Sequence, residues 1–372
     1  MDNITHSLVG LTLAETGLKR ATPLGTATLV LAANFPDIDI VTGLFGNLYY
    51  LEHHRGITHA VAVVPLLSLV LAALIYGWSR WQRGGARFGP LCGLSLLGMA
   101  THPLLDFLNS YGWRPFLPWN ERWFYGDIAF VIDPWLWVLL GGAMFFITAR
   151  TKPQLMLQSA VLLLMVAVIG SSHQTSLVIR LMWLALAGCA VWLRFAFSAQ
   201  ERTARAISIS VLAAMCLYLG MLAWLHQVAL HRTGELAVAA QARDSGAQVQ
   251  TSALPTPANP LRWQAVIATE QAYYLTDLSL TSPTPGFDSL ARYARESGDS
   301  SVIAAARRTA QAQTFLHFAR FPVSEVLTDQ GSSSAEVEIR DVRFQHQGVS
   351  NTFRTLIRLD KNLSPLMERR SH

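Results

Sequence analysis

Long apolar runs separated by short polar loops dominate the first 230 residues of the chain. A helix needs about 20 apolar residues to cross the roughly 30 Å of hydrocarbon in a bilayer. Six runs are long enough or nearly so: 58–78, 90–110, 129–149, 155–171, 176–197 and 206–228. Two further runs, 5–18 and 24–46, are interrupted by polar residues and predict a helical hairpin that its neighbours support. The pattern predicts a mainly α, polytopic membrane domain over residues 1–230.

The pattern changes after residue 230. A polar, helix-like stretch leads into the segment LPTPANP (254–260), whose prolines end any helix, so we treat 231–259 as a helix and linker. Beyond it, four segments rich in β-branched and aromatic residues predict strands: RWQAVIAT, QAYYLTDLSL, AEVEIRDVRF and FRTLIRLD. Residues 287–318 have helical periodicity. We therefore expect a small soluble α+β domain over 260–372.

Composition also distinguishes the first 230 residues from the rest of the chain. The chain has 51% hydrophobic residues, only 14% charged residues and a mean hydropathy of +0.30, outside the usual range for soluble globular proteins. The segment 231–372 nevertheless contains 14 of the 24 Asp and Glu residues. The net charge of +5 is spread over loops, and the absence of a basic stripe with interleaved aromatic residues argues against direct nucleic-acid binding. Cys92, Cys189 and Cys216 lie in apolar runs, and we expect them to pack rather than form a disulfide.

Basic residues predict how the chain is oriented in the membrane. They cluster at Lys19–Arg20, in the loop around Arg83, at Arg150–Lys152 and around Arg202, and such clusters favour the cytoplasmic side. Loops 47–58 and 110–128 and everything after residue 230 then lie outside. The start, MDNITHSLVG, lacks the basic region and cleavage site of a signal peptide, so we expect it to be retained.

This orientation collects ionisable residues in one layer near the outer face. Seven of the ten acidic residues in 1–230 fall there, although ionisable groups are costly in a bilayer and usually mark a function. In THPLLDFLNSYG (101–112), His102 and Asp106 are four residues apart and share a helix face. This spacing fits either a metal site or a plain hydrogen-bonded pair.

Two further motifs contain candidate metal ligands. In FPDID (35–39), Asp37 and Asp39 are typical of a bridging carboxylate with a supporting partner, or of a simple capped turn. In EHHRGITHA (52–60), the sequence predicts Thr58 as a helix N-cap and His59 near the start of a membrane helix. A neutral imidazole suits zinc, whereas the alternative is a set of interfacial histidines that anchor the helix.

Other polar residues of the layer leave alternatives open. Arg55 offers a planar fork for a phosphate. Asp133 precedes Pro134 and is a helix cap or a metal-site residue, and we include Asp127 among the catalytic candidates. The aromatic residues of 111–125 are typical of a belt at the lipid headgroups.

Five motifs together resemble a known family: MDNITHSLVG, FPDID, HRGITHA, HPLLDFLNSYG and WFYGDIAFVIDPWLW. They are similar to the YdjM-type, LexA-binding proteins of the bacterial inner membrane, which are regarded as metal-dependent hydrolases. The resemblance covers roughly residues 1–230 and implies a multi-pass inner-membrane location, a hydrolase activity and an association with LexA. The order His, Asp, His, His-x-x-x-Asp is also similar to zinc-dependent phospholipase C. That similarity implies five zinc ligands that activate water against a phosphodiester: His6, Asp37, His59, His102 and Asp106.

These observations favour a membrane-bound hydrolase that uses a divalent metal, with zinc the first choice. The outer layer suits a lipid or lipid-linked phosphoester, and Asp39, Arg55 and Asp127 are the candidate catalytic residues. Two alternatives use the same ligands: a transporter, and a non-catalytic metal-binding protein with a regulatory or protein-binding role. The transporter alternative predicts polar residues that continue to the cytoplasmic face, which helices 155–228 lack.

Overall fold

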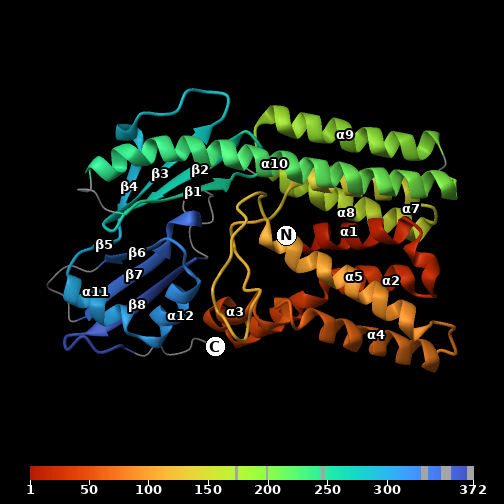
Figure 1. The fold of residues 1–372 in the computed structure, drawn as a ribbon, viewed down its shortest axis with the longest axis horizontal. Helices are drawn as coiled ribbons and strands as arrows, with labels where there is room; N and C mark the ends of the chain where they lie inside the picture. Colours follow the sequence, from red (N-terminus) through yellow and green to blue (C-terminus); the bar gives the residue numbers. More distant parts are fainter. Residues whose placement is uncertain (172–174, 198–199, 244–247, 328–333, 345–352, 367–372) are drawn as a thin grey trace. The chain divides into compact units, whose positions relative to one another are not determined.

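The protein is described by a computed structural model that covers residues 1–372 apart from 172–174, 198–199, 244–247, 328–333, 345–352 and 367–372 (Figure 1). The chain forms two compact units. The helical unit contains Met1–Asp39, Arg55–His226 and Pro255–Pro260. The sheet unit contains Ile40–His54, Gln227–Leu254 and Leu261–His372.

Three helices at the start of the helical unit pack closely side by side. They are α1 (Asn3–Glu15), α2 (Gly25–Asn34) and α5 (Phe88–Phe107), with α2 in contact with both of the others. Two glycines permit this approach. A Cβ on Gly10 of α1 would lie 2.7 Å from the carbonyl oxygen of Leu29, and one on Gly98 of α5 would lie 2.8 Å from Cβ of Ala32. Any side chain at these positions would push the helices apart. Helix α4 (Val64–Trp81) packs on α5 and completes this bundle.

The segment before α4 differs from the sequence expectation. The helix predicted from residue 58 begins at Val64, and residues Ile57–His59 instead form a 3₁₀ turn, η3. Thr58 was expected to cap the helix, and that expectation is wrong. Its hydroxyl donates a hydrogen bond of 3.1 Å to Oδ2 of Asp39 instead. This bond fixes the turn against the segment η2 (Phe35–Phe45), a 3₁₀ helix that continues α2.

The apolar run 129–149 is shorter as a helix than its composition suggests. It forms α6 (Pro134–Leu136), a π-helical turn η4 (Trp137–Gly141) and α7 (Gly142–Thr148) in direct succession. Asp133 caps this series, since its side chain accepts hydrogen bonds from the backbone N–H of Trp135 and Leu136. Of the two alternatives for Asp133, the structure therefore shows the helix cap.

Three long helices complete the apolar part: α8 (Lys152–Ser171), α9 (Leu177–Ala196) and α10 (Glu201–Arg243). Helix α10 joins the apolar run 206–228 to the polar stretch after it. Within the described residues, six helical segments are long and apolar enough to cross a membrane: 25–45, 64–81, 88–107, 152–171, 177–196 and 201–242. The structure thus supports a helical membrane protein.

The sheet unit contains two four-stranded sheets and short helices. In the first sheet the order is β1 (Gln250–Pro255), β2 (Arg262–Ala268), β3 (Ala272–Ser279) and β4 (Ala291–Ala294). In the second it is β5 (Glu296–Ser297), β6 (Pro322–Val326), β7 (Ser334–Asp341) and β8 (Arg354–Asp360). The four predicted strand segments correspond to β2, β3, β7 and β8. Strand β1 includes Leu254 and Pro255, which were predicted to lie in the linker.

Residues 287–318 are only partly helical. Tyr293 in β4 pairs with Tyr273 in β3, so its β-propensity prevails over the helical period there. The helices begin later, at α11 (Ser300–Arg307) and α12 (Ala310–Phe318). Both contact β8, and α12 also contacts α3 (Asn47–His53).

Candidate metal centre

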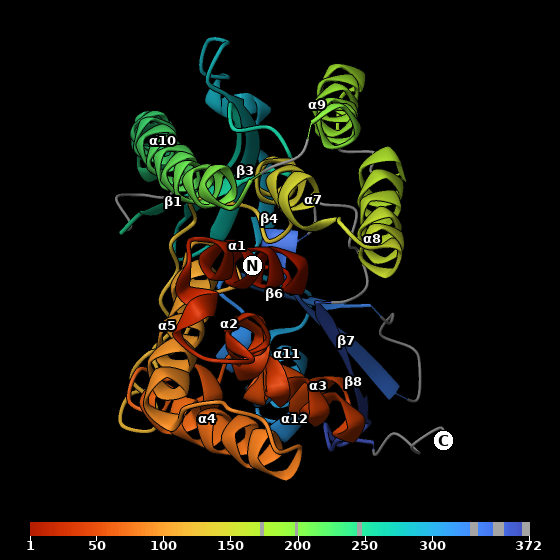
Figure 2. The ribbon, with the colours of Figure 1, turned by 90° about the vertical axis from the view of Figure 1, so that its right-hand side faces the viewer.

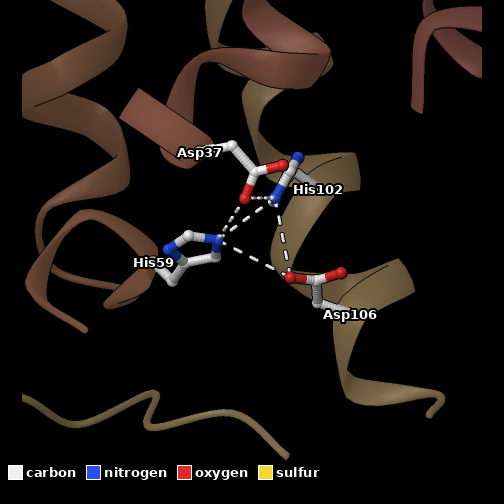
Figure 3. A group of neighbouring side chains, drawn as sticks. All are labelled: Asp37, His59, His102 and Asp106. Atoms are coloured by element: carbon white, nitrogen blue, oxygen red, sulfur yellow. Dashed lines mark hydrogen bonds and ion pairs between the residues drawn. The ribbon is translucent and has the colours of Figure 1, made fainter. Parts of the chain in front are cut away.

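Four side chains of the helical unit converge on one point (Figure 3). Asp37 comes from η2, His59 from η3, and His102 and Asp106 from α5. The two histidine Nε2 atoms are 3.1 Å apart, and Oδ1 of Asp37 lies 3.4 Å from His59 Nε2 and 3.3 Å from His102 Nε2. Oδ2 of Asp106 lies 3.6 Å from each Nε2. A tetrahedral zinc site with bonds of 2.0–2.1 Å has ligand atoms about 3.3 Å apart. The spacing therefore fits one divalent ion.

Hydrogen bonds on the far side of each imidazole determine which nitrogen faces the centre. Nδ1 of His102 lies 2.7 Å from the carbonyl oxygen of Ala33, which only accepts, so Nδ1 carries the proton. Nδ1 of His59 lies 3.0 Å from the Thr58 hydroxyl and 3.3 Å from Oδ2 of Asp39. In the neutral form of each ring, Nε2 then presents its lone pair to the centre. Such a carboxylate or carbonyl behind a histidine is the usual support of a metal ligand.

Local sequence explains why these side chains meet. His102 and Asp106 are four residues apart on α5, so they point to the same side of the helix. Asp39 accepts a hydrogen bond of 3.0 Å from the backbone N–H of Arg55, and Arg55 itself adopts a left-handed conformation with φ of 52°. This contact ties the turn that carries His59 to the segment that carries Asp37. Asp39 therefore positions ligands rather than contributing an atom to the group of four.

Arg55 lies beside the centre and is buried. Its Nε atom lies 3.0 Å from Oδ2 of Asp106, and its Nη1 atom donates to Oδ1 of Asn109 at 2.9 Å. The guanidinium also lies over the ring of Tyr111, 4.7 Å from its centroid. The arginine thus places a fixed positive charge against one of the two central carboxylates.

His6 lies next to the group of four without belonging to it. Its ring stacks on His102 with centroids 3.8 Å apart, and its Nε2 lies 3.3 Å from Oδ1 of Asp106. The amino group of Met1 also contacts this oxygen. The two oxygens of Asp106 therefore have different surroundings, because Oδ2 faces His59 and His102 while Oδ1 faces His6.

Asp127 lies outside the group of four potential ligands. It is buried and has a φ of 53°, and the flanking residues bond to the end of α5, with Gly126 N 2.8 Å from the oxygen of Phe107. The structure thus brings together Asp37, His59, His102 and Asp106, with His6, Asp39 and Arg55 in contact with them. It does not add Asp127 to that set.

Three residues around the centre were not singled out as site residues from the sequence. Asn3 donates a hydrogen bond of 2.9 Å to Oδ2 of Asp37, and Asn109 accepts from Arg55. Trp113 was assigned to a headgroup belt, yet its indole N–H donates to the carbonyl oxygen of His59 at 2.8 Å. Asn109 lies just beyond the end of α5 at Phe107, so helical spacing from Asp106 does not indicate its role.

The donor set suits a divalent transition metal. Two imidazole nitrogens with two carboxylate oxygens are a combination that zinc accepts, and the two carboxylates supply the negative charge that a divalent ion requires. His59, His102 and Asp106 are at most 1% exposed, and the side chain of Asp37 is 15% exposed. The centre is thus shielded from water on most sides, with Asp37 as its most accessible member.

Comparison with known proteins gives two matches. Residues 1–176 match the family described as YdjM inner membrane protein. The uncharacterised protein YfhP of Bacillus subtilis (strain 168) is 28% identical over 148 residues, which cover 37% of this chain and 43% of YfhP. The chain thus spans less than half the length of this curated relative, and no solved structure matches it.

The matched region contains all four residues of the candidate metal centre together with α1, α2, α4 and α5. Three of the five motifs that carry the resemblance, FPDID, HRGITHA and HPLLDFLNSYG, contain the four residues of the centre. Residues 1–176 are therefore similar to the YdjM family of inner membrane proteins.

Proposed function

We propose that the protein is a membrane-bound, metal-dependent hydrolase that cleaves a phosphoester of a lipid or lipid-linked substrate. One observation carries this proposal: the Nε2 atoms of His59 and His102 face each other at 3.1 Å, while an acceptor oxygen lies beside Nδ1 on the opposite side of each ring. Two lone pairs at that separation repel each other unless a cation lies between them. Two carboxylates complete the set of ligands, so a divalent ion is the species that the residues fit best.

The surrounding residues would support hydrolysis in distinct ways. A divalent ion polarises a phosphoryl oxygen and acidifies water, which is the chemistry that hydrolysis of a phosphoester requires. Asp39 keeps the Nδ1 proton of His59 in place, and Ala33 does the same for His102. Arg55 holds Asp106 and supplies positive charge where negative charge would develop on a phosphoryl group. We assign Asp39 and Arg55 positioning roles on this basis.

We also propose that the centre faces the outer side of the inner membrane, with the sheet unit on the same side. The arginine-rich loop around Arg83 supports a cytoplasmic position for the opposite end of α4 and α5. Topology reporters fused at Arg83 and after the last residue should report opposite sides of the membrane. If both reporters give the same side, the orientation is wrong.

Metal content and hydrolysis test the function together. Full-length protein purified in detergent should retain a divalent metal by mass spectrometry and should hydrolyse bis(p-nitrophenyl) phosphate. His59→Ala and His102→Ala remove one ligand each and should weaken metal binding more than the roughly 10–100-fold expected for a supporting residue. His53→Ala provides a matched control, because this histidine bonds to the carbonyl oxygen of Tyr49 and lies outside the candidate ligand groups.

The outcomes separate the candidate functions. Metal-dependent hydrolysis that is lost in both ligand variants and kept in His53→Ala supports the hydrolase. Stoichiometric metal without hydrolysis of any phosphoester would instead support the non-catalytic metal-binding alternative. Unchanged metal content in the ligand variants would contradict the metal centre itself.

A further inference from the structure

The helical unit contains an apolar cavity of about 420 Å³. It is lined by residues of α1, η4, α7, α8 and α9 and by Val30 of α2. Figure 2 shows α7, α8 and α9 on one side of α1. The volume is within the roughly 300–1,000 Å³ typical of ligand sites. Almost all of its lining is apolar, with Leu8, Val138 and Leu162 among the residues that contribute. An apolar ligand is therefore the class that this cavity suits.

Two tryptophans form fixed walls. The indole N–H of Trp183 donates to the carbonyl oxygen of Pro134 at 2.7 Å, and that of Trp137 donates to Asp2 at 3.1 Å. Because both N–H groups have partners, the rings offer apolar surface to the cavity. Gly141 adds room on the same wall, since a Cβ there would meet Cδ1 of Leu8 only at 3.6 Å.

The cavity reaches the metal centre through α1. Asn3 and Ser7 line it, and the same Asn3 side chain donates to Oδ2 of Asp37. Asp37 is the most exposed of the four central residues. Asn3 thus contacts both the apolar cavity and Asp37, so a molecule with its apolar chain in the cavity and its polar head beside Asn3 would place the head near Asp37.

The membrane supplies such molecules directly. Helices α8 and α9, which form one side of the cavity, are long and apolar enough to cross a bilayer. Leu163 on α8 and Leu181 on α9 are more than half exposed, as expected for side chains that face lipid. Hydrocarbon chains are therefore the most abundant apolar groups around this part of the protein.

We propose that the cavity binds one hydrocarbon chain of the lipid substrate and so presents the headgroup phosphoester to the metal centre. This inference rests on the proposed function and narrows it, because it assigns the substrate to lipids with a long apolar chain. The cavity then contributes binding energy remote from the reacting bond, which holds the phosphoester in position.

The test fills the cavity by substitution and compares hydrolysis of two substrates with the same headgroup. One is a long-chain phospholipid and the other is its water-soluble, short-chain analogue. Leu162→Trp places a large ring in the cavity, whereas Leu163→Trp makes the same change at an exposed neighbour on α8. We expect Leu162→Trp to lower kcat/KM for a long-chain phospholipid by at least tenfold. Hydrolysis of the water-soluble short-chain analogue should change less than twofold, and Leu163→Trp should affect neither. Gly141→Met fills the cavity from η4 instead of α8 and should reproduce the effect if Leu162→Trp does not fold.

A second readout does not require catalysis. Native mass spectrometry of the detergent-purified protein, incubated with the same long-chain phospholipid, should show one bound lipid, which Leu162→Trp should displace and Leu163→Trp should not. If the lipid is displaced but neither substrate is hydrolysed by the wild type, the cavity assignment stands and the proposed function fails. If hydrolysis is observed and neither filled variant alters long-chain hydrolysis or lipid binding, the cavity assignment is wrong and the hydrolase stands.

Discussion

The helical unit and the sheet unit each bury charged side chains. In the sheet unit, donors and acceptors of the chain pair with one another, whereas in the candidate metal centre several acceptors converge. In the sheet unit, the fully buried Arg343 contacts Oδ2 of Asp341 through Nη2 at 2.7 Å and Nε at 2.8 Å. Asp341 also accepts from the backbone N–H of Arg320 at 2.8 Å, and Arg343 donates to the oxygen of Phe318 at 3.2 Å. Each of these contacts pairs a donor with an acceptor, so the chain itself compensates the buried charge.

In the helical unit, acceptors face acceptors. The Nε2 atoms of His59 and His102 converge with oxygens of Asp37 and Asp106, whereas the positive groups of Arg55 and Met1 contact Asp106 alone among these four. The comparison teaches that buried charge alone does not indicate a binding site. A site is indicated where the acceptor atoms outnumber the donors that the chain directs at them, because an external cation then completes the arrangement.

The largest expected effect on stability concerns the buried ion pair of Arg343 and Asp341. Arg343→Met keeps apolar volume but leaves Asp341 buried without its main partner, which should destabilise the sheet unit by about 3–5 kcal/mol. Hydrogen exchange of the β7 and β8 amides in the full-length protein should then accelerate by a factor of about 100 or more. The exchange should be the same with and without added zinc. Exchange that stays at the wild-type rate would show that the pair is not structural.

The matched change in the helical unit should have a much smaller effect on stability. His59→Phe keeps a ring and removes one of the two facing lone pairs, so the loss of the bond to Thr58 is partly offset by relief of repulsion. In metal-free protein we expect a destabilisation of about 1 kcal/mol or less. Zinc should raise the melting temperature of the wild type and leave that of His59→Phe unchanged, since only an intact site couples binding to folding. A wild type that zinc does not stabilise would contradict the contrast between the two units.

Helices and strands could be predicted from the sequence where a continuous pattern of apolar and polar residues defines them locally. The apolar runs from residue 152 onward and the four strand segments have a continuous pattern, and each forms the predicted element. The start of α4 was misplaced because a threonine before an apolar run is a typical cap. Here Thr58 bonds instead to Asp39, nineteen residues earlier in the chain, and no local pattern reveals such a partner.

The candidate site shows the same limit. The pair His102 and Asp106 follows from helical spacing, whereas the meeting of Asp37 with His59 depends on Asp39, which bonds to the backbone of Arg55 and to the hydroxyl of Thr58. The contact of Asn3 with Asp37 depends on the packing of α1 against α2. Asp127 appeared equivalent to the other acidic residues in the sequence, and only the fold separates it from them.

The smallest expected effect is a dependence of stability on pH in the sheet unit. Burial alone would raise the pKa of Glu338, but hydrogen bonds from Arg340 and Arg354 outweigh burial and hold this pKa below its ordinary value. A carboxylate with a lowered pKa stabilises the fold above the unfolded-state pKa of about 4.3, and that contribution is lost as the pH falls through the lower, folded-state pKa. Because the partners are partly exposed, we expect about 1 kcal/mol or less at neutral pH. Glu338→Gln should therefore accelerate hydrogen exchange of the β7 amides relative to the wild type at pH 7, and the stability difference should shrink toward pH 3. A difference that stays constant over this range would show that Glu338 stabilises β7 through packing rather than through its charge.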